Sequence, residues 1–200
     1  MKKDPGNWID GLWSTDLYQS HKKENFEILD RYLNISPKQI LDIGCGLAWE
    51  SRLFGEKYGS ELYLLDGDTS ANESKPDTSN TGKYHASPDD FLFYHGLEKL
   101  NKSLQELGTK NYHLIDCNNI VIPNDVKFDL ITSWVSCGFH YPVSTYRNLI
   151  IKHSHKNTRI IMDLRIIYKK PGLPESEEGV EIVKIINYRN KYAMAELKIV

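Results

Sequence analysis

Short apolar runs alternate with amphipathic stretches along most of this chain. The runs expected to form strands lie at residues 39–43, 61–65, 112–115, 128–134 and 159–164. Apolar residues spaced three and four positions apart predict helices at 14–33, 47–58, 87–107 and 143–153. Several strand runs are apolar without interruption, which indicates burial on both faces. Alternating strands and helices therefore predict a doubly wound α/β fold with a mostly parallel sheet.

The end of the chain follows a different pattern. Residues 180–186 and 192–200 both have the character of strands, and the polar stretch 187–191 joins them. Two strands joined by so short a polar connection form an antiparallel hairpin. We therefore expect a seven-stranded, mostly parallel sheet that ends in an antiparallel C-terminal hairpin.

One long stretch interrupts the alternation. Residues 67–88 are rich in Ser, Thr, Asn, Asp and Gly and contain few apolar side chains. Such a segment cannot bury enough surface to offset the entropy lost when it becomes ordered. A loop of this length in a compact domain is either functional or disordered. We expect a flexible loop here, and both a lid over a ligand pocket and a solvated insertion remain open.

The residues that suggest chemistry surround a glycine turn. The first predicted strand ends at Asp42 and is followed by Gly44, Cys45 and Gly46, and the second ends at Asp66. Glycines let the backbone approach a ligand, and the N-terminus of the next helix offers free N–H groups. A carboxylate at the end of the second strand can accept hydrogen bonds from both ribose hydroxyls. This arrangement predicts a pocket for an adenosine-containing cofactor.

The glycine spacing favours one class of cofactor over another. The dinucleotide fingerprint G-x-G-x-x-G would require glycine at position 49, where this chain has Trp49. The run instead resembles motif I of class I S-adenosylmethionine (SAM)-dependent methyltransferases, in which an acid precedes G-x-G-x-G. Ala48 stands at the third glycine of that motif. The resemblance covers roughly residues 38–200 and implies SAM as cofactor, with S-adenosylhomocysteine (SAH) as its product.

The resemblance also assigns roles to residues at the strand ends, where ligands bind in open parallel sheets. It implies that Asp66 binds the ribose and that Asp116 meets the adenine amino group. Asp42 is expected to orient the glycine turn or to reach the ligand's ammonium through water. The full expected cofactor site consists of Asp42, Gly44, Cys45, Gly46, Asp66, Gly67, Asp116, Cys117, Ser133 and Trp134. An N-terminal helical segment, 1–37, is expected to cover substrate and cofactor, beside a SAM-binding domain at 38–200.

The methyl acceptor has to be inferred from residues 133–142. This stretch stands where class I methyltransferases carry the loop that shapes the acceptor site, and it lacks the Asn/Asp-Pro-Pro-Tyr signature of many amino-group methylators. It loosely resembles the loop of small-molecule and sugar O-methyltransferases. A general base with a near-neutral pKa accelerates methyl transfer to a hydroxyl by roughly 10²–10⁴-fold. His140 is our hypothesis for that base, and the alternative is a histidine that binds the loop backbone.

These observations favour a SAM-dependent methyltransferase that acts on a small molecule, at a hydroxyl group. A non-catalytic SAM-binding subunit or regulator is the main alternative. A nicotinamide oxidoreductase is a third and weaker one, opposed by Trp49 and by the terminal hairpin.

Composition restricts the partners. A formal charge of −2 gives no electrostatic signature for nucleic acid or an anionic membrane, and we expect neither as a partner. No apolar run approaches 18 residues, and no signal-peptide pattern opens the chain, so a cytoplasmic location is expected. Three cysteines without a C-x-x-C pair fit a reduced chain, and the histidines suggest no metal site. The sequence does not indicate an oligomeric state.

Overall fold

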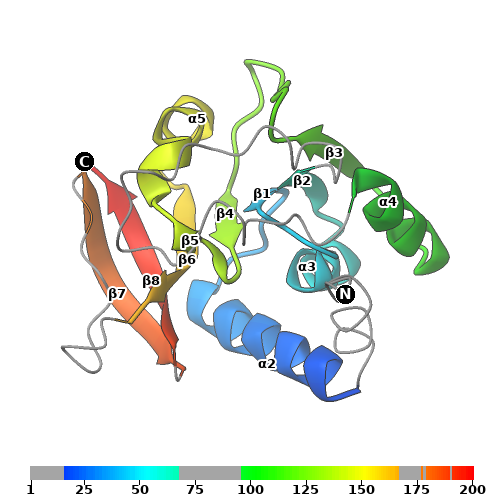
Figure 1. Cartoon of the computed structure of the whole chain (residues 1–200), viewed down its shortest axis with the longest axis horizontal. Coiled ribbons are helices and arrows are strands. Elements are labelled where there is room, and N and C mark those ends of the chain that lie inside the picture. The colour runs from blue at the N-terminus through cyan, green and yellow to red at the C-terminus, as the bar shows by residue number, and fades with distance from the viewer. Residues whose placement is uncertain (1–15, 68–95, 167–176, 178, 190) are drawn as a thin grey trace, which may run out of the picture.

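A seven-stranded sheet runs through the centre of the molecule in the order β3-β2-β1-β4-β6-β8-β7 (Figure 1). The computed structural model describes residues 16–67, 96–166, 177, 179–189 and 191–200. The strands are β1 (Gln39–Ile43), β2 (Glu61–Asp66), β3 (Tyr112–Asp116), β4 (Leu130–Ser133), β6 (Arg159–Arg165), β7 (Val180–Tyr188) and β8 (Tyr192–Ile199). Strands β3, β2, β1, β4 and β6 are parallel, and β8 is antiparallel to both β6 and β7. The predicted mostly parallel sheet with its C-terminal hairpin is confirmed.

Helices cover both faces of the sheet (Figure 1). One layer contains α2 (Asp16–Leu33), α3 (Trp49–Tyr58) and α4 (Leu97–Glu106). The other contains the 3₁₀ turn η2 (Val143–Tyr146) and α5 (Arg147–His153). Each layer closes its own apolar core, and the sheet separates the two cores. Because helices lie on both sides, the central strand β4 is buried along its whole length.

The stretch 133–142, which we expected to be a loop, contains a further strand, β5 (Ser136–Tyr141). It packs against β6 and is not part of the seven-stranded order. Cys137, Phe139 and Tyr141 are buried, as is Gly138, and the three alternate with smaller or polar residues. That period of two, together with the aromatic side chains, favours extended backbone over a loop.

The buried face of α2 also differs from the prediction. Leu17, expected on the apolar face, is 81% exposed, whereas Lys22 and Asn25 are buried. The second half of the helix follows the apolar pattern, with Leu29 and Leu33 in the core. The first half packs on charged groups from other elements, so a polar face is buried there.

Three predicted segments lie wholly or partly outside the described residues. These are the proposed lid at 67–88, of which Gly67 alone is described, the first nine residues of the predicted helix 87–107, and the first fifteen residues of the segment 1–37. The division of the chain at residue 37 therefore stays a prediction. Among the helices of the described residues, none is long and apolar enough to cross a membrane.

Candidate functional site

The glycine turn after β1 is fastened to the end of β2. The backbone N–H groups of Gly44 and Cys45 both donate to the carbonyl oxygen of Leu65, at 2.7 and 3.2 Å. Gly44 and Gly46 have φ values of +68° and +56°, a region that glycine enters without steric cost. Ala48, at the third motif position, has a φ of +53° and directly precedes α3. The turn therefore keeps a left-handed conformation at the third glycine position although an alanine stands there.

Asp66 connects this turn to the carboxyl end of β2. Its Oδ2 accepts a hydrogen bond from the Gly46 N–H at 2.6 Å, and its Oδ1 accepts one from the Gly67 N–H at 2.7 Å. Burial raises the pKa of Asp66 to about 6, although both of these hydrogen bonds act in the opposite direction. The carboxylate is thus held in one orientation at the edge where the fold places ligands.

Asp116 lies beside Asp66 at the end of the neighbouring strand. The two residues are paired across β2 and β3, and the Cys117 N–H donates to the backbone oxygen of Asp66 at 2.9 Å. Asp116 Oδ1 accepts from both the backbone and side-chain nitrogens of Asn118, at 2.9 and 3.1 Å. The structure therefore brings both predicted nucleoside-binding acids together at one edge of the sheet.

Two other predicted residues, Asp42 and Ser133, are enclosed in the protein. Asp42 is fully buried and accepts hydrogen bonds from the hydroxyls of Ser51, at 2.5 Å, and Thr132, at 3.3 Å. Ser133 Oγ donates to the Ile43 carbonyl at 2.7 Å. Of the two roles expected for Asp42, these contacts fit the orientation of the glycine turn and of α3. Ser133 fastens β4 to β1 in a similar way.

Trp134 and Val135 connect β4 to β5, and Ser136 is the first residue of β5. Val135 and Ser136 contact two neighbouring parts of the site. The Val135 N–H donates to Asp163 Oδ2 at 3.1 Å, and Val135 has a φ of +50°. Ser136 lies directly against Gly44, where an added Cβ would be 2.6 Å from the Ser136 Cβ. The predicted acceptor segment therefore touches the predicted cofactor turn.

His140 does not have the near-neutral pKa expected of it. Burial, together with the Arg165 guanidinium, lowers the pKa of His140 to about 4. Arg165 itself donates to the Phe139 carbonyl at 3.1 Å and lies over the Phe139 ring. The imidazole is consequently neutral at pH 7 but only a weak base.

The three cysteines are held as thiols. Burial raises the pKa of Cys45 and Cys137 well above the ordinary value, and that of Cys117 to about 11. A thiol with a raised pKa supplies little nucleophilic thiolate. None of the three is therefore an activated nucleophile.

A buried charged group beneath α2 was not predicted from the sequence. Lys22 Nζ and Asn25 Nδ2 both donate to Glu50 Oε1, at 2.8 and 3.2 Å. Burial opposes the charge on Lys22, but Glu50 outweighs it, and the pKa of Lys22 is raised. Asp163 lies close to this pair, and burial raises its pKa to about 7. Since these residues come from α2, α3 and β6, no sequence spacing could have indicated the group.

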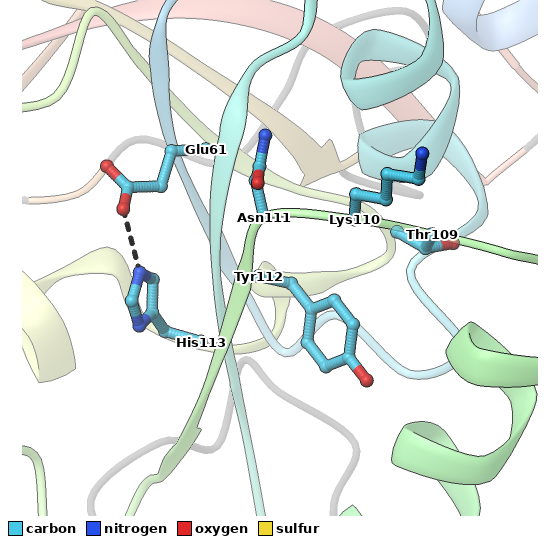
Figure 2. Close-up of a pocket in the computed structure, with 6 residues that line it drawn as sticks. All are labelled: Glu61, Thr109, Lys110, Asn111, Tyr112 and His113. Carbon is cyan, nitrogen blue, oxygen red and sulfur yellow. Dashed lines mark hydrogen bonds and ion pairs between the residues drawn. The ribbon is translucent and has the colours of Figure 1, made fainter.

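A surface pocket of about 510 Å³ lies at the opposite edge of the sheet, at the amino ends of β2 and β3. Figure 2 shows its lining, with Glu61 and His113 on one side, where His113 Nε2 lies 2.9 Å from Glu61 Oε1. The glycine turn follows the carboxyl end of β1, so this pocket is separate from the predicted site. Within the described ranges, no group of three or more His, Cys, Asp or Glu residues could hold a metal ion.

The comparisons with known proteins found similarity to solved structures and no similarity in sequence to a known family. No family model and no curated protein matches the chain. A solved structure of a mutant of MtNAS in complex with S-adenosylmethionine matches with a TM-score of 0.58 and 14% identity, over 98% of this chain and 68% of that one. A SAM-dependent methyltransferase from Aquifex aeolicus matches with a TM-score of 0.57 and 13% identity, over 91% and 98%.

The plantazolicin methyltransferase BpumL in complex with SAH matches with a TM-score of 0.52 and 16% identity, over 82% of this chain and 55% of that one. This chain thus spans about half the length of BpumL and about two thirds of MtNAS. At such low identities these likenesses show a shared fold.

Proposed function

Because this chain has the fold of class I SAM-dependent methyltransferases, we propose that it binds SAM and transfers the methyl group to a hydroxyl of a small molecule. The observation that carries the cofactor half is the junction of Asp66 with the glycine turn. Two backbone N–H groups fix this carboxylate, and each of its oxygens keeps a lone pair for a ribose hydroxyl. Charge-assisted bonds of this kind are stronger than bonds between neutral groups.

The residues at this edge fit a nucleoside ligand. Gly44 and Gly46 leave the turn without side chains, so a ligand can approach the backbone closely. The N-cap of α3 has no side-chain hydrogen bond, which leaves its first N–H groups to a ligand. Both bonds that Asp116 accepts from Asn118 go to Oδ1, so Oδ2 is the oxygen proposed for the adenine amine. When bound, SAM supplies an electrophilic methyl group on a sulfonium centre.

A hydroxyl acceptor requires removal of its proton as the new bond to oxygen forms. His140 remains the base proposed from the sequence, because its neutral imidazole can accept a proton at pH 7. With a pKa of about 4 it holds that proton weakly. Its contribution to the rate of methyl transfer should therefore lie toward the low end of the roughly 10²–10⁴-fold typical of a general base. The same weak basicity favours the second candidate function, SAM binding without methyl transfer.

Isothermal titration calorimetry with SAH tests the cofactor half. We expect binding by the native protein and a loss of at least about tenfold in affinity for Asp66→Ala, since bonds to two ribose hydroxyls disappear. Asp125→Ala, at an exposed loop position, is the matched control and should bind SAH normally. Absence of heat with SAM and SAH, together with heat from a nicotinamide dinucleotide, would refute the proposal.

Transfer of tritium from methyl-labelled SAM separates the two candidate functions. A panel of sugars, phenols and hydroxy acids serves as acceptors, with His140→Ala as the variant. If His140→Ala forms less labelled product than the native protein while its affinity for SAH is unchanged, the chain is an enzyme that uses His140 as its base. Binding of SAH without any labelled product supports the non-catalytic alternative.

A further inference from the structure

Several buried polar atoms have no hydrogen-bond partner within the described part of the chain, and two of them belong to residues that adjoin Val135 in the sequence or accept its N–H. These two are Oδ1 of Asp163 and Nε1 of Trp134, whose residues are 0% and 8% exposed. A buried polar group without a partner costs about 1–3 kcal/mol, and such groups are rare in folded proteins. One of these atoms is an acceptor and the other a donor.

Both side chains lie on the same side of the sheet. Trp134 packs in the core cluster that contains Met194, and Met194 is the cross-strand partner of Asp163 on β8. The backbone gives a second connection, because the Val135 N–H donates to the other carboxylate oxygen of Asp163 at 3.1 Å. Asp163 is therefore anchored through Oδ2, and its unpartnered Oδ1 remains for a ligand.

The backbone at this point is strained. Val135 has a φ of +50°, which is a steric outlier for a β-branched residue. Such strain persists only where the surroundings enforce it, and it is concentrated at functional sites. The bond to Asp163 holds Val135 in this conformation, and the next residue, Ser136, lies against Gly44. The strained turn thus connects the two unpartnered atoms to the cofactor side of the site.

The charges around Asp163 favour a neutral ligand group. The Lys22 ammonium lies close enough to stabilise the Asp163 carboxylate, and it would repel a second cation there. The negative charge of Glu50 disfavours the Asp163 carboxylate, and the positive charge of Arg189 favours it. Tyr192 is a further neighbour. Because burial raises the pKa of Asp163 to about 7, a large share of it is ionised at neutral pH and can accept a hydrogen bond.

We propose that Asp163 and Trp134 bind a hydroxyl group of the methyl acceptor, with the carboxylate accepting the hydroxyl hydrogen and the indole N–H donating to its oxygen. That the ligand is the methyl acceptor rests on the proposed function. That the two side chains bind a hydroxyl group does not. A hydroxyl suits both atoms, because it donates one hydrogen bond and accepts others.

Nuclear magnetic resonance of the indole N–H groups tests the subsite directly. The full chain, labelled with ¹⁵N, has four tryptophans, and Trp134→Phe identifies the signal of interest. Phenol is the probe and toluene its control without a hydroxyl. We expect phenol to shift the Trp134 signal saturably, with or without SAH, and toluene to leave it in place.

Asp163→Asn supplies the variant, because it retains the shape of the side chain. Phenol should bind this variant about tenfold more weakly, as expected for loss of a bond to a charged acceptor. Asp125→Asn should bind phenol normally. SAH affinity, measured by calorimetry, should be unchanged in both variants and shows that they fold.

Three results would overturn the proposal. Equal shifts with phenol and toluene, or equal phenol affinity in Asp163→Asn, would show that these atoms do not recognise a hydroxyl. No shift with phenol at all would assign them to a buried water. Failure of SAH to bind the native protein would instead refute the proposed function, whatever the outcome with phenol.

Discussion

Gly44 is the residue at which the proposed cofactor turn meets the segment proposed to bind the methyl acceptor. It combines a φ of +68° with close packing against Ser136, so an added side chain would meet both backbone strain and steric overlap. Gly59 has almost the same φ, +67°, but nothing within 4 Å of the position of a Cβ. The two glycines therefore separate the effect of backbone conformation from that of close approach.

Gly44→Ala should lower the free energy of unfolding by roughly 2–5 kcal/mol, the sum of left-handed strain and overpacking. Gly59→Ala should lower it by about 1–2 kcal/mol, from strain alone. Urea denaturation monitored by tryptophan fluorescence measures both values. Equal losses would mean that Ser136 moves away from residue 44 without cost.

Asp163 gives a prediction for the dependence of stability on pH. Its pKa in the folded protein, about 7, is above the ordinary value of 3.8 because of burial. Between about pH 4 and pH 7, Asp163 therefore keeps its proton in the folded state and has lost it in the unfolded state. The contribution of this group to stability is consequently lost as pH rises from about 4 through 7.

Asp163→Asn should consequently match the native protein near pH 4 and exceed it at pH 8. We expect a gain in unfolding free energy of roughly 1–4 kcal/mol at pH 8. Asp125→Asn, at an exposed position, should show no such difference between the two pH values. If the unfolding free energies of Asp163→Asn and the native protein differ by the same amount at pH 4 and pH 8, the pKa of Asp163 is not raised.

At the scale of elements, α2 changes character along its length. Its second half follows the apolar periodicity of the sequence, and Leu29 lies in the core with no exposed surface. Its first half buries Lys22 and Asn25 against Glu50 of α3, while Leu17 faces outward. The helix therefore serves both as a core element and as a polar cover for the carboxyl ends of β1 and β6.

Leu29→Ala should cost about 2–5 kcal/mol in unfolding free energy, because it leaves a cavity in a closed core. Leu17→Ala, which belongs to the same periodic pattern, should change stability by less than about 0.5 kcal/mol. Thermal unfolding of the two variants under identical conditions provides the comparison. A comparable loss for Leu17→Ala would place that side chain in a buried contact.

At the scale of the whole molecule, burial decreases from the centre of the sheet to its C-terminal edge. Strand β4 is buried throughout, whereas the edge strand β7 has no fully buried residue and departs from regular pairing with β8 at two places. Local opening requires less free energy where fewer apolar groups are buried.

Amide hydrogen exchange should follow this gradient. We expect the amides of β1 and β4 to exchange at rates near the limit set by global unfolding, and those of β7 at least about tenfold faster. Mass spectrometry of peptides from 39–43, 130–133 and 180–188 measures the difference. Equal protection of β7 and β4 would show that another surface covers the edge strand.

Except for β5, the amino-acid sequence by itself determined the order of strands and helices, the terminal hairpin and the glycine turn with Asp66. These features depend on periodicity and on local backbone chemistry, which short segments contain. Tertiary structure decided the environment of each side chain, because burial and charge arise from residues distant in sequence. Arg165 and burial make His140 a weak base, and Lys22 and Glu50 form a charged pair beside Asp163. The pairing of Asp163 with the strained Val135 could be seen only once β4 and β6 lay side by side.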